Sequence, residues 1–259
     1  MTPLKVAHLS DSHLLESKDS EFCGVKTAER LEKIINSLKD KQYDLLIFTG
    51  DIAESGKKES YELLASMLNN LNIPFILIPG NHDDDEVLMK TIPSKENQWV
   101  SPKELVSFKG WHFLHLNTNV KGKAHGEFTE AMLLKLKQTM EQAPQNLCLL
   151  IHHPLLPINI PFLDKYIVTN PEKALETLTP KVNLVLCGHV HGDYRWSKNG
   201  VCFESAPSTG FQFEAPDESS PMNKGGYSID NSAYGYKEFS LLDQAYLSKT
   251  IWCHDEKIG

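Results

Sequence analysis

The segment DLLIFTGD, residues 44–51, joins a continuous apolar run to a glycine and an acidic residue, and PFILIPGNHD, residues 74–83, repeats this arrangement. Uninterrupted apolar runs of this length predict strands that are buried on both faces. Between them, apolar side chains recur at helical spacing: Tyr61, Leu64, Leu68 and Leu71. The order of strand, helix and strand predicts a sheet with helices packed on its outside.

The same alternation extends in both directions from this segment. Upstream, a strand is predicted at 6–10, followed by a helix whose apolar side chains are Leu31, Ile34, Ile35 and Leu38. Downstream, a helix is predicted at 128–142 and apolar runs occur at 111–117, 146–152 and 182–188. The last runs have no helices between them, which favours antiparallel strands: 201–205, 236–242 and 246–252. The pattern predicts an α/β (α+β) protein with one mixed sheet or two packed sheets.

The composition is that of an ordinary folded protein, with 41% apolar and 23% charged residues among 259. Without a linker or an internal repeat, we expect one domain over residues 1–259. The net charge of −8 gives no general attraction for a phosphate backbone and argues against a nucleic-acid binder. No apolar run reaches the ~18 residues of a membrane span. Five cysteines without CxxC spacing predict a reduced, cytoplasmic protein.

Five polar signatures follow the apolar runs in order: Asp11-Ser-His13, Gly50-Asp51, Gly80-Asn-His-Asp83, His152-His-Pro154 and Gly188-His-Val-His191. Each alone is commonly a turn or a hydrogen-bonded histidine. Because ligands of α/β sheets bind outside the strand ends, all five are expected to converge on one rim. Imidazole and carboxylate ligands together suit manganese, iron, zinc or cobalt. So many ligands exceed the needs of one tetrahedral ion and suit two ions that share a carboxylate.

This order of motifs resembles the calcineurin-like metallophosphoesterase superfamily. Further residues resemble its class III cyclic nucleotide phosphodiesterases: Leu14, 24–27, 162–164, Asn170, 207–209, Gln212 and Phe213. The resemblance implies a four-layer αββα sandwich, with two mixed β-sheets packed face to face and helices outside.

The resemblance also implies a ligand set for two metal ions. Asp11, His13, Asp51 and His191 would surround the first ion, and Asp51, Asn81, His152 and His189 the second, with Asp51 bridging. His152 is preferred to His153 because the superfamily's motif reads H-x-P. The ions would be iron, manganese, zinc or cobalt, with iron and manganese favoured.

A mechanism follows from these assignments. Two cations bridged by Asp51 would lower the pKa of a shared water, and the resulting hydroxide would attack the phosphorus. His82 follows a predicted ligand and is predicted as the general acid, with Asp83 orienting it. Substrate contacts are predicted from Asn81, His82 and His191. The long loop 153–170 leaves directly from His152 and is predicted to add Asp164 and Asn170.

The favoured function is therefore hydrolysis of a small molecule, 3′,5′-cyclic AMP, at its 3′ ester. Alternatives are another phosphodiester or pyrophosphate, such as a glycerophosphodiester, a 2′,3′-cyclic nucleotide or a nucleotide-linked lipid. A binding scaffold of the same fold without metals is a further alternative, although no ligand is missing from the motifs. The acidic charge argues against a DNA nuclease, and no basic amphipathic insertion indicates membrane binding. The oligomeric state is open, with a homodimer as one option. A second long loop, 209–233, has no assigned role.

Overall fold

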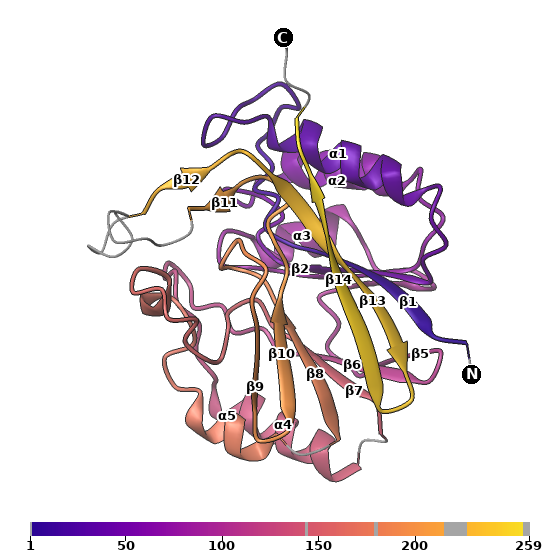
Figure 1. Ribbon diagram of the computed structural model, residues 1–259, viewed down its shortest axis with the longest axis vertical. Coiled ribbons are helices and arrows are strands. Elements are labelled where there is room, and N and C mark those ends of the chain that lie inside the picture. Colours follow the sequence, from indigo (N-terminus) through magenta and orange to yellow (C-terminus); the bar gives the residue numbers. More distant parts are fainter. Residues whose placement is uncertain (1, 143–144, 179–180, 215–226, 256–259) are drawn as a thin grey trace.

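A six-stranded mixed sheet holds both ends of the chain in the computed structural model, which describes residues 2–142, 145–178, 181–214 and 227–255 (Figure 1). Its strand order is β14 (Ala245–Cys253), β13 (Tyr234–Leu242), β1 (Leu4–Leu9), β2 (Leu45–Thr49), β3 (Phe75–Ile78) and β4 (Gln98–Val100). The strands from β1 to β4 are parallel, while β13 and β14 are antiparallel to their neighbours.

A second six-stranded mixed sheet packs against the first. Its order is β5 (Val106–Phe108), β6 (Trp111–His115), β7 (Leu147–Leu150), β8 (Val182–Cys187), β10 (Val201–Ser205) and β9 (Arg195–Lys198). The four inner strands are parallel, and the two edge strands are antiparallel. A separate hairpin pairs β11 (Gln212–Phe213) with β12 (Ile229–Asp230).

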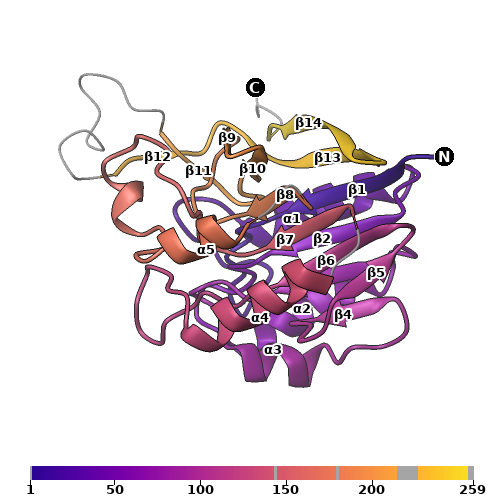
Figure 2. The same ribbon diagram turned by 90° about the horizontal axis from the view of Figure 1, so that it is seen from below.

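Helices cover the outer faces of both sheets (Figure 2). The first sheet packs on α1 (Thr27–Leu38), α2 (Lys58–Leu68) and α3 (Asp85–Thr91). The second packs on α4 (Glu130–Gln142) and α5 (Glu172–Thr177). The predicted sandwich of two mixed sheets with helices outside is confirmed.

The core explains the continuous apolar runs. In β2, Leu46 and Phe48 face the helices, while Leu45 and Ile47 face the second sheet. The same division holds in other inner strands, so both faces of these strands are buried. One apolar layer contains side chains of both sheets, so the two sheets share a core. The single domain over residues 1–259 stays a prediction.

Several short elements were not predicted. The strands β4, β5 and β9 have only three or four residues each, and β5 and β9 contain exposed positions, so they carry no clear apolar pattern. Part of the loop 209–233 forms the strands β11 and β12, whereas residues 215–226 lie outside the described residues. Among the described residues, no helix has the length and apolar character needed to cross a bilayer. All five cysteines are free thiols.

Candidate metal centre

The motif residues converge because they follow parallel strands. Asp11, Asp51 and Asn81 come shortly after β1, β2 and β3 of the first sheet. His152 and His189 come shortly after β7 and β8 of the second sheet. Since the sheets pack face to face, their strand ends present these side chains to one region, as predicted.

The backbone at this region is strained. Five of the predicted ligands have left-handed backbone conformations, with φ between 43° and 72°: Asp11, His13, Asp51, His189 and His191. Such conformations are uncommon for residues other than glycine and concentrate at functional sites. The chain also approaches itself closely here. A Cβ atom on Gly80 would lie 2.2 Å from Asp51 Oδ1, and one on Gly188 would lie 2.0 Å from Ser10 Oγ. A side chain at Gly80 or Gly188 would therefore collide with neighbouring atoms, so both positions require glycine.

One group of ligand atoms comes from Asp11, His13 and His191, and all three residues are buried. The Nε2 atoms of His13 and His191 are 3.0 Å apart, and His191 Nε2 lies 3.6 Å from Asp11 Oδ1. Asp11 is held in place by the backbone N–H of His189, which donates to its carboxylate at 3.0 Å.

A second group lies on the other side of Asp51. His152 Nε2 is 3.2 Å from Asp51 Oδ2 and 3.2 Å from Asn81 Oδ1. The same Asp51 oxygen lies 3.8 Å from His13 Nε2, so Asp51 touches both groups. The His189 ring packs edge-on against the His152 ring, with centroids 5.1 Å apart.

These ligand atoms suit metal ions because their lone electron pairs face one another. His191 Nδ1 donates to the Phe211 carbonyl at 3.0 Å, which leaves its Nε2 as an unprotonated acceptor. Burial and the neighbouring His13 hold the pKa of His191 well below its ordinary value. A metal-ligating histidine usually binds the metal through one ring nitrogen and donates a hydrogen bond from the other ring nitrogen to a group such as a backbone carbonyl.

His152 shows the same arrangement. Its Nδ1 donates to the Thr49 carbonyl at 2.7 Å, so its Nε2 faces the oxygens of Asp51 and Asn81. Burial alone would lower the pKa of His152, but attraction to Asp51 raises it to about 9. The oxygens of Asp51 and Asn81 therefore favour a positive charge next to His152 Nε2, either a proton on the imidazole or a bound cation.

His153 belongs to a third group of possible ligand atoms, together with His152 and His189. Its Nδ1 pairs with Thr118 Oγ1 at 2.8 Å, and its ring contacts His189, with centroids 4.7 Å apart. The ring nitrogen Nε2 of His152, not that of His153, lies at hydrogen-bond distance from Asp51. This geometry supports the choice of His152 as the ligand.

His82 stands beside the metal centre with a partner that the sequence did not predict. Its Nδ1 donates to the Glu54 carbonyl at 2.9 Å and lies 3.3 Å from the Glu54 carboxylate. Burial alone would lower the pKa of His82, but Glu54 and Asp51 raise it to about 10. Glu54 also accepts from His13 Nδ1 at 2.7 Å. Burial alone would raise the pKa of Glu54, but hydrogen bonds from His13 and His82 lower it to about 2.

The predicted role of Asp83 in orienting His82 is wrong. The Asp83 carboxylate accepts from the backbone N–H groups of Ile52, Ala53 and Gly80 and from the Tyr61 hydroxyl. These bonds join the turn after β3 to the segment after β2. Glu54 takes the orienting position, from the turn after β2.

A cavity of about 380 Å³ opens on the metal centre and has an aromatic wall. Its polar end contains His13, Asp51, Asn81, His82, His189 and His191. Its apolar side includes Phe22, Phe162, Tyr166, Phe211, Phe213 and Tyr227. We call these six rings the aromatic wall. The ring centroid of Phe162 lies 6.1 Å from Phe213 and 5.1 Å from Tyr227.

The loop 153–170 reaches this cavity, but not through the polar residues that the sequence predicted. Asp164 accepts from the Ile158 N–H at 2.8 Å. Asn170 accepts from the N–H of Phe128 and donates to its carbonyl. Both side chains hold the loop together, and neither is among the described residues that line the cavity. Their predicted contact with substrate is therefore not supported, and the loop lines the cavity with Phe162, Leu163 and Tyr166 instead.

Comparisons with known proteins agree with this geometry. The family model of calcineurin-like phosphoesterases matches residues 4–193. The chain is 32% identical to a probable cyclic nucleotide phosphodiesterase of Coxiella burnetii, covering 96% of this chain and 97% of the relative. It is 28% identical to the 3′,5′-cyclic adenosine monophosphate phosphodiesterase CpdA of Escherichia coli K12, covering 96% and 89%.

A solved structure has a similar fold. A dimetal phosphatase from Danio rerio superimposes with a TM-score of 0.66 at 13% identity, covering 96% of this chain and 99% of that one. At this identity the likeness concerns the fold alone. The match of the family model over residues 4–193 and the relative at 32% identity show that this protein belongs to the calcineurin-like phosphoesterase family.

Proposed function

We propose that the protein is a dinuclear metal-dependent phosphodiesterase that opens 3′,5′-cyclic AMP at its 3′ ester, in the cytoplasm. The observation that carries the proposal is the cavity, where a cluster of carboxylate, imidazole and amide ligands adjoins the aromatic wall. The ligands suit a phosphodiester, and the rings suit a planar base, since bases stack favourably on aromatic side chains. A glycerophosphodiester has no aromatic group to use this wall.

Two sets of residues would hold the metals. Asp11, His13, Asp51 and His191 would bind one ion, and Asp51, Asn81, His152 and His189 the other, with iron or manganese favoured over zinc or cobalt. When bound, the ions would supply the positive charge that attracts the phosphodiester and acidifies an attacking water. Asn81 and His191 line the cavity and are positioned to meet the phosphate.

His82 would deliver the proton that the leaving oxygen needs. Because its Nδ1 is bonded to Glu54, the proton on Nε2 is the one available to substrate. A metal bound by Asp51 would neutralise that carboxylate, so Glu54 would be the group that keeps His82 protonated. A protonated imidazole beside the reacting phosphate has the properties of a general acid.

A substrate panel tests the proposal. The manganese-loaded protein should turn over 3′,5′-cyclic AMP with a higher kcat/KM than 2′,3′-cyclic AMP, a glycerophosphodiester, bis(4-nitrophenyl) phosphate or 4-nitrophenyl phosphate. Chromatography should identify 5′-AMP as the product, because the 3′ ester is the bond that breaks. If cyclic AMP reacts no faster than the aryl diester, the cyclic nucleotide assignment fails. If fewer than about one metal ion per chain remains after manganese loading, a binding scaffold is favoured.

The aromatic wall makes a separate prediction. Phe162→Ala should raise the KM for cyclic AMP about tenfold, since loss of one stacking ring weakens base binding by roughly 1–3 kcal/mol. A glycerophosphodiester, which has no aromatic ring to place on the wall, should keep its KM. Trp252→Ala is the matched control, because it removes an exposed ring that does not line the cavity. Steady-state kinetics with both substrates decide, and an unchanged KM for cyclic AMP would remove Phe162 from the binding site.

A further inference from the structure

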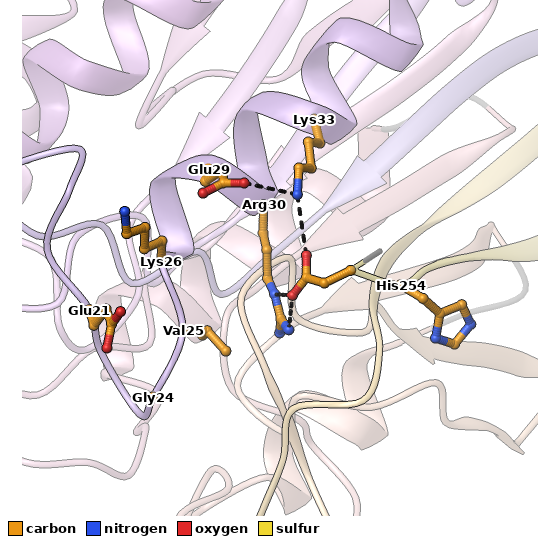
Figure 3. Close-up of a pocket in the computed structure, with 9 residues that line it drawn as sticks. Glu21, Gly24, Val25, Lys26, Glu29, Arg30, Lys33 and His254 are labelled. Atoms are coloured by element: carbon orange, nitrogen blue, oxygen red, sulfur yellow. Dashed lines mark hydrogen bonds and ion pairs between the residues drawn. The ribbon is translucent and has the colours of Figure 1, made fainter. Parts of the chain in front are cut away.

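Arg30 is a buried cation that the proposed chemistry does not use. It is one of two arginines in the chain and lies on α1 with 4% of its surface exposed. Its side chain forms part of the wall of a cavity of about 740 Å³ and points from the helix toward the end of the chain beside His254 (Figure 3). A buried charge is stable only where partners satisfy it, so its partners indicate its role.

Two of the partners are backbone carbonyls far apart in the sequence. Arg30 Nη1 donates to the Gly210 carbonyl at 2.7 Å, and Nη2 donates to the Asn231 carbonyl at 2.8 Å. The guanidinium group also lies over the Tyr234 ring, with Cζ 4.8 Å from the centroid. Only the rigid fork of an arginine can bond two such carbonyls at once while facing a further acceptor.

Asp255 is that further acceptor. Its Oδ2 accepts from Arg30 Nε at 2.9 Å and also from Nη2. On the exposed side, its Oδ1 lies 3.4 Å from Lys33 Nζ, which pairs with Glu29 as well. The carboxylate therefore balances the buried charge and fixes the plane of the guanidinium group.

The two carbonyls mark the two ends of the β11–β12 hairpin. Gly210 lies two residues before β11, and Asn231 follows β12 directly. Between these ends lie Phe211, Phe213 and Ile229, which line the cavity of the metal centre. The Phe211 carbonyl also accepts from the ring of His191, so this hairpin reaches both the aromatic wall and a predicted ligand.

We infer that Arg30 is a positioning residue for substrate binding: it clamps both ends of the β11–β12 hairpin and thereby holds Phe211 and Phe213, the hairpin's part of the aromatic wall, against the base. Asp255 orients the guanidinium group for this task. The inference rests on the proposed function for the identity of the substrate, but the clamp itself depends only on the contacts of Arg30.

Arg30→Gln tests the clamp by kinetics. The KM for cyclic AMP should rise about tenfold, with kcat lowered less than about threefold, because the charge-assisted bonds removed here order the binding surface and do not reach the phosphate. The KM for a glycerophosphodiester, which has no aromatic ring, should not change. Arg30→Lys keeps the charge without the fork and should show the same defect. Lys33→Gln, which removes the exposed partner of Asp255, is the matched control and should behave like the wild type.

Hydrogen–deuterium exchange tests the clamp without substrate. The Glu214 N–H donates to the Ser228 carbonyl across the hairpin at 3.0 Å, and its exchange should be faster in Arg30→Gln. If Arg30→Gln does not fold, Asp255→Asn should give a smaller rise of KM in the same direction. Unchanged exchange, full rescue by lysine or an equal rise of KM for both substrates would overturn the inference. If the wild-type protein does not hydrolyse cyclic AMP, the proposed function fails, and exchange alone supports or overturns the clamp.

Discussion

Replacing Asp51 by asparagine should lower turnover of cyclic AMP and of bis(4-nitrophenyl) phosphate alike, by roughly 10³-fold or more. Asp51 is the carboxylate that touches both groups of ligand atoms, since its Oδ2 lies 3.2 Å from His152 Nε2 and 3.8 Å from His13 Nε2. Asparagine keeps the shape and can still accept from the His82 N–H, but it brings no negative charge to share between two cations. The loss is therefore independent of the leaving group.

Metal content gives a readout apart from activity. Elemental analysis of Asp51→Asn should find less metal per chain than in the wild-type protein after identical loading. Asp44→Asn is the matched control, because Asp44 flanks the opposite end of β2, accepts from the backbone N–H of Lys5 and pairs with the Lys109 ammonium group. It should leave metal content and kcat near wild type. Full metal content in Asp51→Asn, with more than about a tenth of the wild-type activity, would show that Asp51 does not bridge.

The fold was predictable because its central strands are buried on both faces. In β2 and β3 every residue is buried, so the sequence of each strand is an uninterrupted apolar run, and such a run predicts a buried strand. The strand β9 could not be found in this way, since its four residues are largely exposed and it contains two basic side chains. Its pairing with β10 arises from the tertiary structure and leaves no periodic signal.

The convergence of the predicted ligands could be expected for a related reason, whereas the contacts that support their side chains could not. A polar residue directly after a buried strand has a known place at the rim of the sheet. The direction of a side chain within a turn is not encoded in this way. Asp83 neighbours His82 in the chain but bonds to the backbone N–H groups of Ile52, Ala53 and Gly80. Glu54, 28 residues before His82, reaches it because the turns after β2 and β3 lie side by side.

Replacing His82 by alanine should separate proton donation from metal binding. Turnover of cyclic AMP should fall by roughly 10²-fold or more, because a ribose alkoxide leaves poorly without a proton. Turnover of bis(4-nitrophenyl) phosphate should fall much less, since nitrophenolate is a stable anion. Metal content should not change, because the predicted ligands remain.

The contacts of Glu54 and Asp83 sharpen this test. Glu54→Gln weakens the interaction that keeps His82 protonated, so its loss should also depend on the leaving group, although less strongly than that of His82→Ala. Asp83→Asn is the matched control: it disturbs the same turn without touching the His82 ring, so any loss should be equal on both substrates. Equal losses for His82→Ala on both substrates, with metal content unchanged, would mean that His82 stabilises charge or binds substrate instead of donating the proton. Leaving-group dependence in Glu54→Gln but not in Asp83→Asn would place the proton on His82 under the control of Glu54.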